Sequence, residues 1–129
     1  MIVDASALLA VLFQEVEAAE FIEALAVAKV SRMSAVNYLE AAIRIDSKNN
    51  AIAAQAFEAF MALSDITIEP VTLNQVKLAR LAYAQFGKGR HPAGLNFGDV
   101  FAYALAKDRG EPLLFKGDDF GKTDVEKVM

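Results

Sequence analysis

Residues 1–12, Met-Ile-Val-Asp-Ala-Ser-Ala-Leu-Leu-Ala-Val-Leu, contain the change from strand to helix that indicates the fold class. Met1 to Val3 is a short apolar run of the kind that forms a buried strand, and residues 6–13 are predicted to form a helix directly after it. Asp4 stands at the junction, where Asp is a favoured N-cap. A strand that passes straight into a helix predicts the first unit of a parallel α/β sheet.

The rest of the chain repeats this alternation of short apolar strands and helices. Residues 87–95 hold three of the seven glycines and Pro92, and we therefore expect a loop there. Strands alternating with helices favour a parallel sheet covered by helices on both faces. The predicted strands are residues 1–3, 29–33, 66–71 and 113–115, with a last short one at Val125, and the predicted helices are residues 6–13, 17–28, 34–47, 51–63, 72–86 and 96–109.

The composition is that of a compact globular protein. Apolar residues make up 55% of the 129 residues and charged residues 23%, so we expect a single domain over residues 1–129. Asp4 interrupts the N-terminal apolar run early, and no long uncharged apolar stretch follows, so we expect neither a secretory signal nor a membrane span. These features predict a cytoplasmic protein. The net charge of −4 argues against a protein that coats nucleic acid, but it is compatible with a nuclease that has an acidic metal site.

The candidate metal ligands are carboxylates. With no cysteine and one histidine, the chain excludes thiolate sites and a multi-histidine zinc centre, which leaves the oxygen ligands that Mg²⁺ and Mn²⁺ prefer. Asp4 and the pair Asp118–Asp119 follow predicted strands, where parallel sheets place their active sites. Glu40 lies within one helix and Asp99 in the first turn of another. Gathered together, these carboxylates would repel one another unless a divalent cation neutralised them, which points to phosphodiester or phosphoryl chemistry.

Each acid also has a plain structural interpretation. Asp4 is equally well explained as a helix cap, and Asp99 lies three residues after Asn96 at the spacing of a capping box. Glu40, beside the helical repeat of Val36, Leu39 and Ile43, can form an exposed pair with Arg44, worth about 0.3–0.5 kcal/mol. An acidic turn after Gly117 would account for Asp118 and Asp119. The hydroxyl of Ser6 is available to a metal-bound water, a phosphate or a local turn.

Basic residues stand close to two of these acids in the sequence. Lys88, Arg90 and His91 lie on the glycine-rich loop before Asp99, and Lys116 precedes the Asp118–Asp119 pair. They could hold a phosphate backbone, or the loop could be an ordinary solvated surface. His91 could also act as an acid or a base.

Four segments make the chain resemble the PIN domains, and more closely the VapC toxins of bacterial type II toxin–antitoxin pairs. The resemblance implies a three-layer α/β/α fold with a central, mainly parallel sheet of four to five strands. It also implies an endoribonuclease that depends on Mg²⁺, with Mn²⁺ as an alternative, a VapB-like antitoxin whose tail occupies the acidic groove, and a homodimer. The four segments are MIVDASALLAVL, SAVNYLEAAI around Glu40, FGKGRHPAGLNFGDVFAYALAK around Asp99, and EPLLFKGDDFGKTDV near the end.

The resemblance assigns roles to individual residues. Asp4, Glu40 and Asp99 match the acidic metal-site positions of the family, Ser6 matches its hydroxyl after the first strand, and Asn96 matches a frequent polar neighbour. The fourth acid departs from the pattern, because many PIN domains carry an Asp where this chain has Gly117. Asp119, which precedes Phe120 as in the family's Asp-Phe ending, is preferred for that role, and Asp118 is the alternative. Ala5 replaces the usual Thr or Ser.

The working hypothesis is that these acids bind one or two metal ions, which activate a water for attack on an RNA phosphodiester. Two other function classes remain open. In the first, Asp4 is the nucleophile of a phosphatase or phosphotransferase, although Ser6 stands where haloacid-dehalogenase-like enzymes need a second Asp. In the second, the chain is a PIN-like module with an impaired site that binds RNA or a partner protein.

Overall fold

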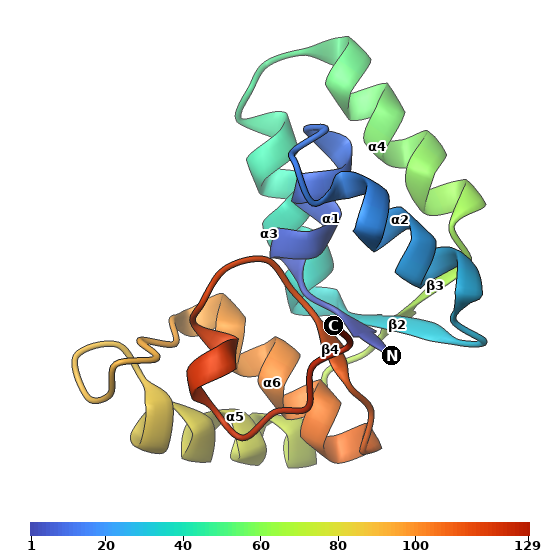
Figure 1. Cartoon of the computed structure of the whole chain (residues 1–129). Helices are drawn as coiled ribbons and strands as arrows, with labels where there is room; N and C mark the ends of the chain where they lie inside the picture. The colour runs from blue at the N-terminus through green and yellow to red at the C-terminus, as the bar shows by residue number, and fades with distance from the viewer.

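Four parallel strands form the central sheet in the computed structural model, which describes residues 1–129 (Figure 1). The strand order is β3-β2-β1-β4. The first strand therefore lies inside the sheet, with β2 and β3 added on one side of it and β4 on the other. The expected parallel sheet is confirmed. Its strands are β1 (Ile2–Val3), β2 (Ser31–Ser34), β3 (Ile66–Glu69) and β4 (Leu113–Leu114).

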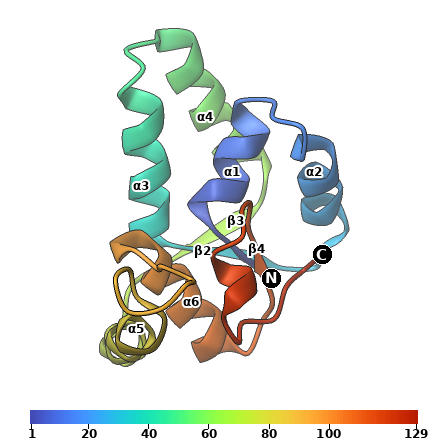
Figure 2. The ribbon, with the colours of Figure 1, turned by 60° about the vertical axis from the view of Figure 1, so that its left-hand side comes forward.

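Helices cover both faces of the sheet, which confirms the predicted three-layer α/β/α fold (Figures 1 and 2). One layer contains the first four helices, and the opposite layer contains α5 and α6 together with a short 3₁₀ helix that the sequence did not predict. The bounds are α1 (Ala5–Leu12), α2 (Ala18–Val27), α3 (Ala35–Asp46), α4 (Ala51–Leu63), α5 (Leu73–Phe86), α6 (Phe97–Arg109) and the 3₁₀ helix η1 (Phe120–Lys122).

Alternation along the central strands divides the apolar core between the two layers. Ile2 and Leu113 pack with α5 and α6, whereas Val3 and Leu114 pack with the first four helices. Neighbouring residues of a strand point to opposite faces, so a two-residue strand is enough to serve both layers. All four side chains are almost completely buried.

The predicted last strand at Val125 is wrong. Val125 is buried as an apolar anchor, but the C-terminal segment pairs with the sheet only through one isolated bridge between Leu113 and Lys127. Because β4 is only two residues long, it offers the segment too little edge for a strand.

Helix α3 presents a different face to the core than its apolar repeat suggested. Asn37, Ala41 and Ile45 are buried, whereas Leu39 is 56% exposed and Ile43 is 59% exposed. The small Ala41 side chain allows close packing at the buried face. The more apolar side chains of the helix, Leu39 and Ile43, remain on the surface beside Glu40.

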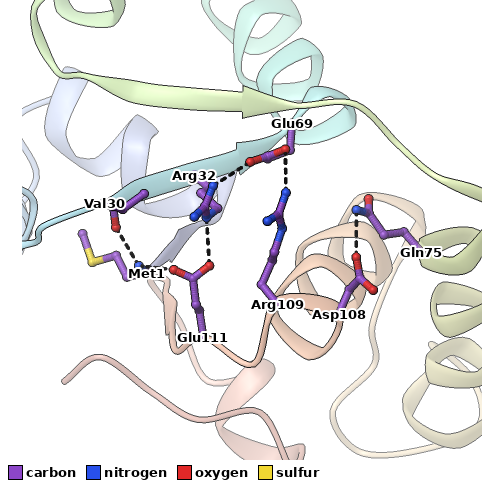
Figure 3. A network of polar contacts seen from close by, with 8 residues as sticks. All are labelled: Met1, Val30, Arg32, Glu69, Gln75, Asp108, Arg109 and Glu111. Carbon is purple, nitrogen blue, oxygen red and sulfur yellow. Dashed lines mark hydrogen bonds and ion pairs between the residues drawn. The ribbon is translucent and has the colours of Figure 1, made fainter.

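A network of ion pairs joins β2, β3 and the segment before β4 (Figure 3). Arg32 donates to Glu69 at 2.9 Å and to Glu111 at 3.0 Å, and Arg109 at the end of α6 reaches the other oxygen of Glu69 at 3.0 Å. The Met1 ammonium group donates to Glu111 at 3.2 Å. This network ties α6 to the sheet on which the remaining elements rest.

No helix combines the length and the apolar character that crossing a membrane requires.

Gly110 ends α6 in the left-handed conformation, with φ of 65°, and turns the chain toward β4. A Cβ atom added there would meet nothing within 4 Å, so Gly110→Ala should cost only the backbone penalty. We expect a loss of about 1 kcal/mol in the free energy of unfolding, measured by urea denaturation. Gly110→Asn should lose less, because Asn tolerates this conformation; equal losses would contradict the explanation.

Candidate functional site

Asp4, Glu40 and Asp99 line one pocket of about 390 Å³. They come from the end of β1, from α3 and from the first turn of α6, so residues far apart in the sequence meet as expected. Ser6 lines the same pocket, whereas Asp118 and Asp119 do not. The remaining lining residues are Ala5, Leu9, Ile43, Arg44 and Ser47.

Asp4 is both a helix cap and a pocket residue. Its Oδ2 accepts a hydrogen bond from the Ser6 N–H at 3.0 Å, which caps α1. The residue is only 3% exposed, and its Oδ1 has no hydrogen-bond partner. A buried carboxylate oxygen without a partner is costly, so this atom is a candidate ligand for a cation.

The Ser6 side chain fastens the loop that follows β4. Its Oγ accepts a hydrogen bond from the Lys116 N–H at 3.0 Å. This long-range contact, which joins the segments after β1 and β4, is not the local turn that the sequence left open for this hydroxyl.

Asp99 also combines capping with a place in the pocket. Asn96 Oδ1 accepts from the Asp99 N–H at 2.9 Å, and Asp99 Oδ2 accepts from the Asn96 N–H at 3.0 Å, which completes the predicted capping box. Because α6 begins at the pocket, its N-terminal dipole also favours negative charge there.

Glu40 forms no ion pair with Arg44. Instead its Oε1 accepts from the Asn37 side-chain amide at 3.3 Å, and its carboxylate lies against the backbone of Gly98. Asn37 also donates to the Gly98 carbonyl at 2.9 Å. Sequence reasoning missed both contacts; the available signals were a polar residue one turn before Glu40 and a glycine inside the first turn of α6.

Burial and mutual repulsion perturb all three acids of the pocket. Burial raises the pKa of Asp4 to about 6, opposed by hydrogen bonds with Ser6 and aided by the charge of Glu40. Burial likewise raises the pKa of Asp99 to about 6, with further contributions from the charges of Asp4 and Asp119. The pKa of Glu40 is raised by burial and by the charge of Asp99, against the hydrogen bond from Asn37. The ionised forms of these carboxylates are therefore disfavoured in the pocket when no cation is bound.

These residues fit a hard divalent cation that keeps part of its water shell. No group of three or more acidic or histidine side chains is arranged as a ready-made ligand set. Mg²⁺ is commonly held by one or two carboxylates and several waters, so a complete protein cage is unnecessary. The unpartnered Oδ1 of Asp4 and the carboxylate of Asp99 in the same pocket provide the one or two carboxylates that such a site needs.

Of the adjacent pair, Asp119 has the clearer connection to the site. Both side chains are exposed, and Asp119 precedes η1 without making a side-chain cap. The charge of Asp119 is one of the causes of the raised pKa of Asp99.

The basic residues selected from the sequence lie outside the acidic pocket. Lys116 pairs with Glu15 and Glu17, and the Arg90 guanidinium lies 5.5 Å from the centre of the Tyr83 ring. Lys88 is exposed. His91 accepts a hydrogen bond at Nδ1 from the Ala93 N–H at 3.0 Å, which gives it a role in the loop itself.

Arg44 is the basic side chain that lines the pocket, and it forms no salt bridge. The sequence interpretation treated it only as a possible partner of Glu40. Its position one helical turn after Glu40 was the signal that could have placed it at the site.

The sequence profile of the PIN domain matches residues 1–126. Ribonuclease VapC28 of Mycobacterium tuberculosis is 51% identical over 130 residues, a match that covers 100% of this chain and 98% of the relative. Ribonuclease VapC of Mycolicibacterium smegmatis is 44% identical, with 99% of each chain covered.

Two solved structures have the same fold at low sequence identity. Mycobacterium tuberculosis VapC20, described as a toxin that cleaves the sarcin–ricin loop, has a TM-score of 0.78 and 18% identity, with 98% of this chain and 97% of that chain covered. A toxin–antitoxin complex from Klebsiella pneumoniae has a TM-score of 0.72 and 17% identity, with 95% and 92% covered. The profile and the full-length relatives agree with the predicted family: the chain belongs to the PIN domain family and, within it, to the VapC proteins.

Proposed function

We propose that this protein is a metal-dependent endoribonuclease and the toxin of a VapBC-type toxin–antitoxin pair. The observation that carries the proposal is the pocket in which Asp4, Glu40 and Asp99 meet, with one buried Asp4 oxygen unpartnered. The ribonuclease names of the full-length relatives support the same activity. Membership of the PIN family gives no support to a phosphatase that uses Asp4 as its nucleophile.

In this proposal Asp4 and Asp99 hold Mg²⁺ or Mn²⁺, with Glu40 completing the acidic wall and Asp119 serving as the fourth acid. Such an ion supplies Lewis-acid chemistry, because it lowers the pKa of water and offsets negative charge on a phosphate. The protein holds Asp4 and Asp99 in place through their caps, and the half-buried setting of Glu40 limits access of bulk water.

Arg44 is the proposed contact for an RNA phosphate beside the acids. An acidic pocket repels a phosphate backbone, so a basic side chain at its wall lowers the cost of bringing the two together. Lys88, Arg90 and His91 would extend the contact along the loop, with Asn96 as a polar neighbour. Lys116 contributes less charge, because Glu15 and Glu17 already neutralise it.

The proposed partners are a second copy of the chain and a VapB-like antitoxin. The Klebsiella pneumoniae structure of the same fold is a toxin–antitoxin complex, which supports an antitoxin for this chain. A basic side chain from the antitoxin tail would neutralise the pocket acids and so block the site.

A surface of exposed apolar side chains beside the pocket supports the homodimer. Leu39 and Ile43 of α3 lie with Phe97, which is 75% exposed, around one hollow that Glu40 also lines. Phe97 continues into a second apolar hollow with Val76 and Phe101. A contiguous exposed apolar patch is typical of a protein interface.

Asp4→Asn and Asp99→Asn should each slow RNA cleavage by about 100-fold or more, because each removes a charge from the proposed site. Cleavage of a mixed RNA substrate by antitoxin-free protein, with Mg²⁺ or Mn²⁺ present, measures the effect. A chelator should stop cleavage, and either ion should restore it.

Asp46→Asn is the matched control, since Asp46 is exposed near the end of α3 and takes part in no ion pair. It should leave the rate unchanged. Asp119→Asn should reduce cleavage more than Asp118→Asn does. Cleavage that persists unchanged in Asp4→Asn or Asp99→Asn would overturn the proposed site.

Stability in the absence of metal should depend on the titration of Asp4. Its pKa rises from 3.8 to about 6 on folding, so the folded state retains a proton that the unfolded state releases in this window. The stabilising effect of the neutral form is complete below about pH 4 and is lost as the pH rises through about 6.

Asp4→Asn should therefore gain stability relative to the unsubstituted protein between about pH 4 and pH 7, by up to roughly 3 kcal/mol. Urea denaturation at several pH values in the presence of a chelator measures this difference. A difference that stays constant with pH would show that the Asp4 pKa is not raised.

Leu39→Glu should convert the dimer to a monomer, because it places a charge on the proposed apolar interface. Sedimentation equilibrium measures the mass. Leu63→Glu is the control, since Leu63 is 83% exposed on α4, outside this surface. A monomeric unsubstituted protein, or a Leu39→Glu variant that remains dimeric, would exclude this interface.

A further inference from the structure

Asn37 is a fully buried polar side chain that donates hydrogen bonds to Glu40, which lines the acidic pocket, and to Gly98 in the first turn of α6. It is 0% exposed and lies one helical turn before Glu40 on α3. Its amide nitrogen donates to the Gly98 carbonyl at 2.9 Å and to Glu40 Oε1 at 3.3 Å. Burying an amide is unfavourable unless its groups are hydrogen-bonded, and its Oδ1 has no partner. A purely structural role would be met at lower cost by an apolar residue.

Gly98 leaves the space in which the Glu40 carboxylate lies. A Cβ atom at residue 98 would be 2.7 Å from the carboxyl carbon of Glu40 and closer still to its Oε2. Gly98 does not have the positive φ that would explain a glycine by backbone conformation. Glycine is unfavourable inside a helix, so its presence here is explained by the close approach of Glu40.

Without these two contacts the Glu40 side chain could adopt other rotamers, which would place its carboxylate elsewhere. Its long side chain has several rotatable bonds, and Arg44 lies one turn further along α3 at the spacing of a helical ion pair. The Asn37 amide and the space over Gly98 instead direct the carboxylate toward α6, where Asp99 lies.

We propose that Asn37 and Gly98 are positioning residues that hold the Glu40 carboxylate in the acidic pocket. The inference rests on the proposed metal-dependent function and names two further residues of that site. Asp4 and Asp99 keep their own capping hydrogen bonds, so loss of the Asn37 amide or of the space at Gly98 would act chiefly on Glu40.

The first test needs neither metal nor RNA. Gly98→Ala should lower the melting temperature of the metal-free protein, because the added methyl group collides with the Glu40 carboxylate. In a Glu40→Ala background the same change should be neutral or should raise the melting temperature, because alanine is the better helix former. Equal losses in the two backgrounds would overturn the packing on which the proposal depends.

The second test measures Mn²⁺ affinity from the electron paramagnetic resonance signal of free Mn²⁺. Asn37→Ala should weaken binding by about 10-fold, as is typical when a group that orients a ligand is lost. In a Glu40→Gln background Asn37→Ala should have no further effect, because the residue acts through Glu40.

Gln75→Ala is the matched control. Gln75 is another buried amide, 3% exposed, that joins α5 to Asp108 at the far end of α6. Its loss should lower the melting temperature without changing Mn²⁺ affinity. An equal loss of Mn²⁺ affinity in Gln75→Ala, or in Asn37→Ala with and without Glu40, would make the role of Asn37 merely structural.

The two proposals fail in different ways. If the unsubstituted protein cut no RNA, the proposed function would fall, whereas the stability coupling between Gly98 and Glu40 would still be measured. If RNA were cut but that coupling were absent, the positioning role would fall and the nuclease would stand.

Discussion

The constraint that the surrounding contacts have to meet is the repulsion among three carboxylates gathered at one edge of the parallel sheet. Asp4 is almost completely buried, and Asp99 and Glu40 share its pocket, so each loses hydration and faces the charge of another. Burying like charges close together lowers the stability of the folded protein. The sheet order, with β1 central and β4 on its other side, is what brings the acids to one place.

The surrounding structure offsets part of this cost with polar groups of its own. Helices α1 and α6 both begin at the pocket, and their backbone N–H groups bind Asp4 and Asn96. Ser6 connects the start of α1 to the loop after β4, and Asn37 connects α3 to α6. These contacts leave an oxygen of Asp4 and one of Asn37 without partners, and the Asp4 oxygen suits a hard cation.

The four strands of the sheet, the six α-helices and the caps followed from local chemistry, and the sequence could predict them, whereas the 3₁₀ helix and the irregular C-terminal segment could not be predicted. Strand and helix order came from short apolar runs, and the capping box of Asn96 and Asp99 came from spacing alone. The buried face of α3 did not, because Asn37 and Ala41 are less apolar than the exposed Leu39 and Ile43. Which face of a helix is buried depends on the neighbouring elements, and so does the pairing of Lys116 with Glu15 and Glu17.

The amino-acid sequence was sufficient for the alternation of elements, for selecting Asp4, Glu40 and Asp99 as acids that meet and, through its resemblance to PIN domains, for the family. Local patterns contain that information because caps, strands and helices depend on residues a few positions apart. The packing of the folded chain was needed to show that Glu40 turns toward Gly98 rather than Arg44, and that Arg44 lines the pocket. These outcomes depend on how close α3, α6 and the loop after β4 lie in space. Residue spacing along the chain does not determine that distance.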